Sequence, residues 1–175
     1  MIPAVSESER VDVLIGLGAN LGDPQLQLQM AVRELELSIT IDAVSSLYLT
    51  SPVGLADQPD FLNLVLRGGC TLPAGELMRR AGGIEKRSGR VVSVRDGPRT
   101  LDIDLLAYGQ QRIVVPGLTV PHPRIHLRRF VLEPLVEVAP DWVHPELRLT
   151  AAEMLDGLSS CERVVRLGPL QGRLF

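Results

Sequence analysis

The chain has 175 residues, and 45% of them are hydrophobic, which is enough for one domain with a substantial core. Its net charge of −3 argues against a general nucleic-acid-binding protein, and no apolar run is long enough to cross a membrane. The first ten residues lack the features of a signal peptide, and two scattered cysteines make no disulfide framework. We therefore expect a soluble, cytoplasmic protein without nucleic-acid or membrane partners.

Hydrophobic patterning predicts six elements between residues 11 and 108. Alternating or continuous apolar residues indicate strands, and apolar residues three and four positions apart indicate helices. Asp23 can cap the first helix, and Gly89 can end the second. In chain order we expect a strand over 11–17, a helix from Pro24, strands over 41–49 and 61–70, a helix from Pro73 and a strand over 100–108.

This β-α-β-β-α-β order predicts an α+β, ferredoxin-like fold, in which helices pack on an antiparallel sheet. A short edge strand is possible over 113–115, and 130–138 and 150–158 are expected to form a C-terminal helical extension. The expected organisation is a flexible leader over 1–10, a single domain over 11–160 and a C-terminal tail over 161–175 that ends in a frayed segment.

Two carboxylates stand out in the last strand of this pattern. Because side chains alternate between the faces of a strand, Leu101 and Ile103 would be buried while Asp102 and Asp104 share the other face, roughly 7 Å apart. Such a pair, with Arg99 just upstream, suits a divalent cation held against phosphates, since magnesium prefers oxygen ligands. A solvated strand face, or ion pairs with nearby arginines, is the alternative interpretation.

Basic residues gather just before this strand. They are Arg79, Arg80, Lys86, Arg87, Arg90, Arg95 and Arg99. A solvated helix face is the ordinary explanation for such a cluster. Its place beside two carboxylates favours an anionic ligand instead.

Four blocks of sequence occur in order between residues 11 and 158. They are G-L-G-A-N-L-G-D from Gly16, D-Q-P-D-F-L-N from Asp57, G-P-R-T-L-D-I-D from Gly97, and V-P-H from Val120 with R-R-F from Arg128. Together they resemble the 6-hydroxymethyl-7,8-dihydropterin pyrophosphokinase family. That family moves a diphosphate from ATP to a pterin alcohol in folate biosynthesis and releases AMP. The resemblance thus implies an ATP-dependent diphosphotransferase acting on small molecules.

The resemblance also implies roles for individual residues. Asp102 and Asp104 would hold two magnesium ions against the ATP phosphates, and the catalytic group would be Arg90, Arg99, Asp102 and Asp104. The residues implied for ATP are Glu85, Arg90, Arg99, Leu105, Thr119, His122 and Arg128. Those implied for the pterin are Thr50, Val53, Phe61, Asn63 and Phe130, with the phenylalanines sandwiching the ring and the amide reading its edge. Without the resemblance, core packing would explain both phenylalanines, and a turn would explain the histidine.

The sequence departs from the family at Val92 and Asp96, inside the loop 90–98, and at Gly82 and Gly83 in the second helix. A polar loop beside the carboxylate strand can close over substrates, so we expect it to be mobile when empty and ordered when they bind. The departures leave two alternatives open. One is a non-catalytic pterin- or nucleotide-binding domain of the same fold, and the other is a magnesium-dependent phosphotransferase for another aromatic alcohol.

Overall fold

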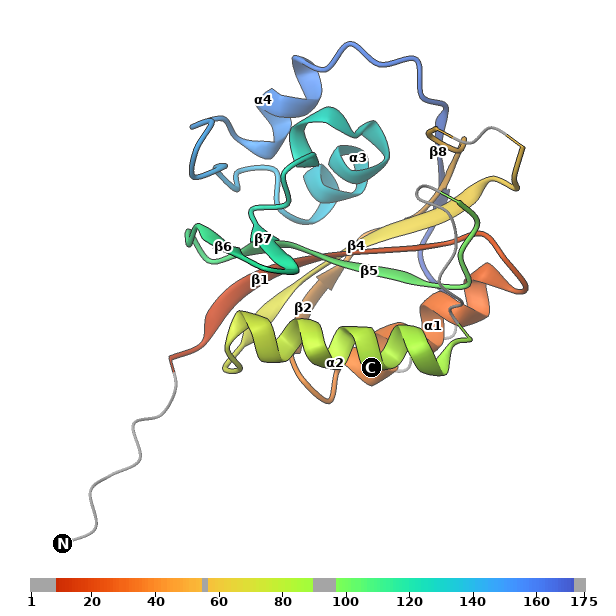
Figure 1. Cartoon of the computed structure of the whole chain (residues 1–175). Helices are drawn as coiled ribbons and strands as arrows, with labels where there is room; N and C mark the ends of the chain where they lie inside the picture. Colours follow the sequence, from red (N-terminus) through yellow and green to blue (C-terminus); the bar gives the residue numbers. More distant parts are fainter. Residues whose placement is uncertain (1–8, 55–56, 90–96, 172–175) are drawn as a thin grey trace, which may run out of the picture.

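A computed structural model describes residues 9–54, 57–89 and 97–171, and within them six strands form one sheet (Figure 1). The strands are β1 (Val11–Ala19), β2 (Thr40–Val44), β3 (Leu47–Thr50), β4 (Phe61–Cys70), β5 (Asp102–Tyr108) and β8 (Val164–Gly168). Their order is β5-β1-β4-β3-β8, with β2 also pairing to β4, and every pair is antiparallel. Strands β6 (Ile113–Val115) and β7 (Leu118–Val120) form a separate hairpin.

Helices cover both faces of the sheet. Helices α1 (Pro24–Leu35) and α2 (Ala74–Arg87) lie on one face, and α3 (Arg129–Val138) and α4 (Ala151–Asp156) lie on the other (Figure 1). Each interface holds its own apolar cluster, one around Leu28 and Leu77 and one around Leu132. None of the helices in the described ranges is long and apolar enough to cross a membrane.

The first two helices form as the sequence predicts. Asp23 caps α1 by accepting a hydrogen bond from the N–H of Leu26 at 3.1 Å, and Pro24 occupies the first turn. Helix α2 runs through Gly82 and Gly83 without a break. Its apolar positions are buried against the sheet, and that packing offsets the low helix propensity of two glycines.

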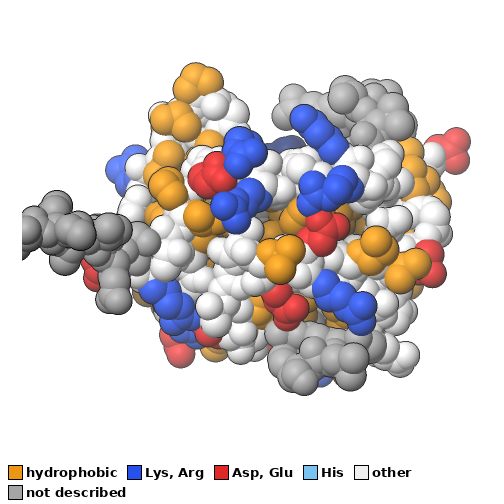
Figure 2. All heavy atoms as spheres, turned by 90° about the horizontal axis from the view of Figure 1, so that it is seen from below, with side chains coloured by type: hydrophobic (Ala, Val, Ile, Leu, Met, Phe, Trp, Pro, Cys, Tyr) orange, Lys and Arg blue, Asp and Glu red, His pale blue; other side chains and the backbone are white. Residues whose placement is uncertain are grey.

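The outer surface over α1 and α2 carries basic and acidic side chains close together (Figure 2). Arg79 and Arg80 both pair with Glu76, at 2.7 and 3.0 Å, and Arg87 pairs with Glu34. For these three arginines of the basic cluster, the solvated helix face is therefore the correct interpretation.

The strand expected over 41–49 is two strands, which are interrupted at Ser45 and Ser46. The Ser45 N–H still donates to the Val65 carbonyl at 2.9 Å, but side chains provide the other partners there. The Ser45 hydroxyl accepts from the N–H of Val65 at 2.9 Å and donates to the Ser46 carbonyl at 2.8 Å. The N–H of Ser46 donates to Glu137 on α3 at 3.0 Å. Serine hydroxyls and a carboxylate here replace sheet partners, an exchange that hydrophobic patterning does not reveal.

Part of the segment 161–175, which was expected to be a C-terminal tail, forms a strand in the structure. Residues 164–168 form β8, which extends the sheet beyond β3. The chain then returns to the α1 side, where Leu170 is only 8% exposed and Gln29 donates to the Gln171 carbonyl at 2.6 Å. At the other end, residues 1–8 lie outside the described part, and Arg10 already pairs with Asp42 at 2.5 Å.

Candidate active site

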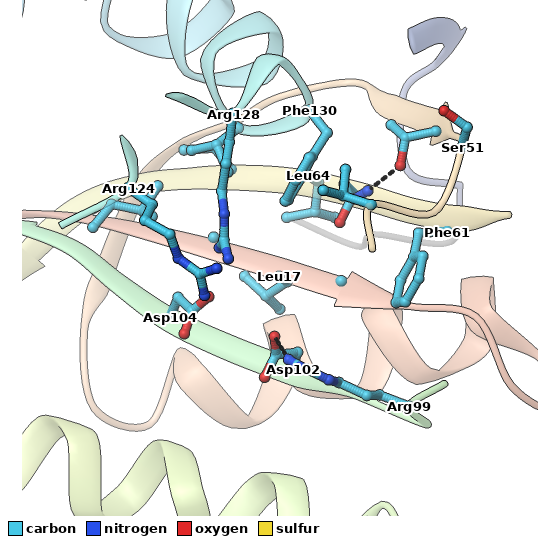
Figure 3. A pocket seen from close by; sticks show the side chains of 18 of the residues that line it. Leu17, Ser51, Phe61, Leu64, Arg99, Asp102, Asp104, Arg124, Arg128 and Phe130 are labelled. Atoms are coloured by element: carbon cyan, nitrogen blue, oxygen red, sulfur yellow. Dashed lines mark hydrogen bonds and ion pairs between the residues drawn. The ribbon is translucent and has the colours of Figure 1, made fainter. Parts of the chain in front are cut away.

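A cavity lies between the middle of the sheet and the start of α3 (Figure 3). Its walls come from β1, β3, β4, β5 and the segment leading into α3. Apolar groups and polar groups meet there, and the lining includes Gly16, Gly18, Thr50, Ser51, Val53, Phe61, Asn63, Gly97, Arg99, Asp102, Asp104, Leu106, Arg124, Arg128 and Phe130. Segments far apart in the sequence thus contribute to one site.

Strand register explains why these residues meet. Gly18 of β1 pairs with Asn63 of β4 on one side and with Asp102 of β5 on the other. Gly16 similarly pairs with Asp104 in the next row on the same face. Because both central residues are glycines, no side chain rises between the amide and the carboxylates, and the sheet surface there is open to a ligand.

Asp102 and Asp104 share the cavity face of β5, as the alternation predicts. Leu101 and Ile103 point the other way and are 1% and 3% exposed. Burial, and after it the charge of Asp102, raise the pKa of the Asp104 carboxyl to about 6 against the opposing effect of Arg128. The folded, ligand-free protein therefore disfavours the charged form of Asp104, mainly because the carboxyl is buried.

Three arginines approach the carboxylates. Arg99 forms an ion pair with Asp102, and Arg124 and Arg128 extend toward Asp104 from the segment before α3 (Figure 3). Arg128 also lies over the ring of Phe130, 5.4 Å from its centroid. Arg124 was not among the predicted site residues, although its position two residues after V-P-H was a signal that could have identified it.

His122 and Glu85 support the charged end without lining the cavity. Burial, and after it the charges of Arg128 and Arg124, lower the pKa of His122 to about 4. Its Nδ1 accepts from the backbone N–H of Arg124 at 3.1 Å, so the neutral ring carries its proton on Nε2 and is a donor there. Glu85 accepts from the N–H of Ile103 at 2.8 Å, between the two aspartates in sequence.

Two phenylalanines and an amide occupy the opposite end. Phe61 opens β4 and Phe130 lies in the first turn of α3, and both rings face the cavity (Figure 3). The Asn63 amide donates to the Thr50 hydroxyl at 2.7 Å, which fixes the orientation of a side chain that is 7% exposed. A Cβ at Gly18 would lie 2.6 Å from the Asn63 oxygen, so the amide depends on the glycine.

Some predicted residues lie elsewhere. Leu105 is packed in the core at 4% exposure, and Thr119 is an exposed residue of β7, so neither contributes to this cavity. Val53 lines the cavity and is 45% exposed. Arg90 and the departures Val92 and Asp96 lie outside the described residues, as does most of the expected lid over 90–98.

Asn20 is a further residue that sequence reasoning left without a role. Its Nδ2 donates to the Pro59 carbonyl at 2.9 Å and to Gln58 at 3.1 Å. Its Oδ1 accepts from the N–H of Arg99 at 2.8 Å. One buried side chain, 4% exposed, therefore joins the segment before Phe61 to the segment before Asp102.

Comparison with known proteins agrees with this geometry. A model of the 7,8-dihydro-6-hydroxymethylpterin-pyrophosphokinase family matches residues 14–140. The chain belongs to this family. It is accordingly a pyrophosphokinase of folate biosynthesis, and ATP is the co-substrate of the family.

Curated relatives carry the same activity in their names. The chain is 37% identical over 158 residues to the 2-amino-4-hydroxy-6-hydroxymethyldihydropteridine pyrophosphokinase of Synechocystis, covering 89% of this chain and 80% of the relative. The corresponding enzyme of Pseudomonas aeruginosa is 42% identical over 138 residues, covering 78% and 85%. Both relatives are matched over most of their length.

Solved structures show the same fold. A crystal structure of wild-type Plasmodium falciparum HPPK-DHPS superposes with a TM-score of 0.68 over 86% of this chain, at 14% sequence identity. This chain spans 45% of that larger protein, so the likeness concerns the α/β fold with its antiparallel sheet.

Proposed function

We propose that this cavity is where the chain transfers diphosphate from ATP to the hydroxymethyl group of 6-hydroxymethyl-7,8-dihydropterin. One observation carries the assignment of the site: a two-phenylalanine pocket with a buried amide opens onto a pair of carboxylates flanked by arginines. The first half suits a flat heterocycle and the second suits a polyphosphate. A reaction that joins a flat heterocycle to a polyphosphate needs both kinds of binding site in one cavity.

At the apolar end, Phe61 and Phe130 would hold the pterin ring between their faces. Asn63 would read the edge of the ring, since its amide has both donors and an acceptor. Thr50 orients that amide, and the half-exposed Val53 would close the rim. These roles follow from the family resemblance and are supported by the shared cavity.

At the charged end, Arg99, Arg124 and Arg128 would bind the ATP phosphates, because the guanidinium fork donates bidentately to phosphate oxygens. The neutral His122 could add an Nε2–H donor. Arg99, now paired with Asp102, would exchange that partner for phosphate when substrate binds. Arg90 belongs to this proposed group on the family resemblance alone.

Magnesium fits the carboxylate pair. Asp102 and Asp104 lie side by side on the cavity face, and burial together with the Asp102 charge raises the pKa of Asp104, which a bound cation would offset. Their carboxylates offer the oxygen ligands that magnesium prefers. No cluster of three or more Asp, Glu, His or Cys side chains suited to a metal occurs within 9–54, 57–89 and 97–171, so substrate phosphates would complete the coordination of the two ions we propose. Bound there, magnesium supplies neutralisation of charge on the phosphates.

The chemistry asks the protein mainly for position and charge. The hydroxymethyl oxygen forms a bond to the β-phosphorus of ATP, and the bond from that phosphorus to the α,β-bridging oxygen breaks. AMP departs with the bonding electrons, and the hydroxyl proton is released. The ring pocket aims the attacking oxygen, and the arginines hold the triphosphate for an in-line approach.

We further infer that β1, α1, β2 with β3, β4, α2 and β5 form a ferredoxin-like unit. The antiparallel neighbours and the order β5-β1-β4-β3 support this assignment. Helices α3 and α4 and strand β8 then extend the unit within a single domain, with only small molecules required as partners.

The decisive assay combines the chain with ATP, magnesium and the dihydropterin alcohol. We expect AMP to form only when the pterin is present. Formation of ADP would instead indicate a phosphotransferase for another alcohol, and tight pterin binding without turnover would indicate a binding domain. Alanine at Asp102 or Asp104 should abolish AMP release while the far-ultraviolet circular dichroism stays unchanged. Activity in both variants would contradict the carboxylate assignment.

A further inference from the structure

The segment between α4 and β8 contacts both sides of the phenylalanine pocket. Two adjacent residues, Glu162 and Arg163, make these contacts. They lie beyond residues 14–140, where the family model matches, and none of the roles implied by the family resemblance falls on them.

Glu162 fixes the start of α3. The N-cap residue Arg128 provides no side-chain cap, so the first N–H groups of the helix need acceptors from elsewhere. The Glu162 carboxylate accepts from the N–H of Phe130 at 3.2 Å. An anion at this end is also favoured by the helix dipole. A residue distant in sequence thereby holds the backbone of Phe130, from which its ring projects into the pocket.

Arg163 fixes the other side of the pocket. Its carbonyl accepts from the N–H of Ser51 at 3.0 Å, and its own N–H donates to the Ser51 hydroxyl at 3.2 Å. Its guanidinium pairs with Asp60, the residue immediately before Phe61. The neighbouring Val164 pairs with Thr50 in the register of β8 with β3.

A second group of contacts anchors the same strand to the body of the protein. Arg166 of β8 bonds to Glu137 of α3 at 2.8 Å, and Glu137 also accepts from the Ser46 and Tyr48 hydroxyls at 2.9 and 2.8 Å. Strand β8 is therefore held to both α3 and β3. Glu162 and Arg163, which directly precede β8, are therefore attached to a strand whose position is fixed.

We propose that Glu162 and Arg163 are positioning residues that set the separation of Phe61 and Phe130 and thereby the affinity for the pterin. The inference rests on the proposed function of this pocket. Neither residue contacts substrate in this scheme. Each acts through the backbone or the neighbour of one phenylalanine.

The test measures the KM values for pterin and for ATP, together with the melting temperature, in the full chain. Glu162→Ala and Arg163→Ala should each raise the KM for pterin about tenfold, the effect of losing one charge-assisted contact, and change the KM for ATP less than about twofold. Glu162→Gln keeps an acceptor oxygen and should restore most of the pterin affinity. Arg112→Ala breaks an exposed ion pair with Glu146 outside the pocket lining and serves as the matched control.

Calorimetric titration of pterin, with magnesium and a non-hydrolysable ATP analogue present, separates this inference from the proposed function. A wild-type chain that binds pterin but forms no AMP would contradict the transfer reaction and leave the affinity comparison intact. A wild-type chain that binds no pterin would overturn both. Variants that lower the melting temperature while the pterin KM and affinity match those of Arg112→Ala would overturn the positioning role alone.

Discussion

The carboxyl of Asp104 is subject to opposing demands from binding and stability. It is half-buried beside Asp102, and burial together with that neighbouring charge raises its pKa from 3.8 to about 6. The ionised form that a cation requires is therefore the form that the folded, ligand-free protein tolerates least. Functional sites commonly lower stability in this way.

Asp104→Asn should abolish AMP release and raise the melting temperature of the ligand-free protein by about 2–4 °C at pH 7.5, equivalent to about 1 kcal/mol. The folded pKa lies above the unfolded value, so the penalty is absent well below pH 3.8, grows as pH rises and is complete above pH 6. The difference between variant and wild type should thus be small at pH 4. Scanning calorimetry at both pH values checks this, and an equal difference at both would contradict it.

The absence of a side chain at Gly18 leaves room for the Asn63 amide. A methyl group there would lie 2.6 Å from the Asn63 oxygen, and Asn63 cannot move without losing its bond to Thr50. We expect Gly18→Ala to raise the KM for pterin about tenfold. Gly75→Ala, with nothing within 4 Å of the new carbon, is the matched control and should leave both KM values unchanged. Equal kinetics in the two variants would remove Asn63 from the proposed pterin contacts.

At the scale of elements, the alternation in β5 could be read from the sequence because its two faces differ sharply in polarity. Strand β4 was likewise predicted with its observed bounds, Phe61–Cys70. Strands β7 and β8 were missed because each is short and half exposed, and each depends on a partner that the sequence does not identify. Edge strands of this kind are specified by tertiary contacts more than by local pattern.

Helix α2 offers a prediction that concerns stability alone. Gly82 lies in the helix interior, and an added Cβ would have nothing within 4 Å. Gly82→Ala should therefore raise the free energy of unfolding by about 0.5–1 kcal/mol, since alanine loses less backbone entropy than glycine in a helix. Urea denaturation measures this. Unchanged KM values would show that the departure from the family at this position is structural, whereas a change in KM for ATP would link α2 to the nucleotide.

At the scale of the whole molecule, the sheet supplies one wall of the site and the start of α3 supplies the other. The sequence pattern predicted strands that carry Phe61, Asn63 and Asp102, and the structure brings these three residues to one cavity. The placement of α3 on the opposite face from α1 and α2 could not be read from local spacing. That placement brings Arg124 to the carboxylates and Phe130 toward Phe61, and it depends on packing across the Leu132 cluster.

Substitutions at Asn20 can show whether this side chain positions both the pterin end and the phosphate end of the site. Asn20→Ala removes bonds to Pro59, Gln58 and Arg99 together, so the part-buried carbonyl of Pro59 and N–H of Arg99 lose this partner. We expect the free energy of unfolding to fall by about 2–3 kcal/mol and the KM values for both substrates to rise. Asn20→Asp keeps the oxygen that accepts from Arg99 and loses the donor to Pro59, so it should raise the KM for pterin much more than that for ATP. Urea denaturation and steady-state kinetics on both variants check this. Two variants with equal effects on the two KM values would mean that Asn20 stabilises the fold without separately positioning either end.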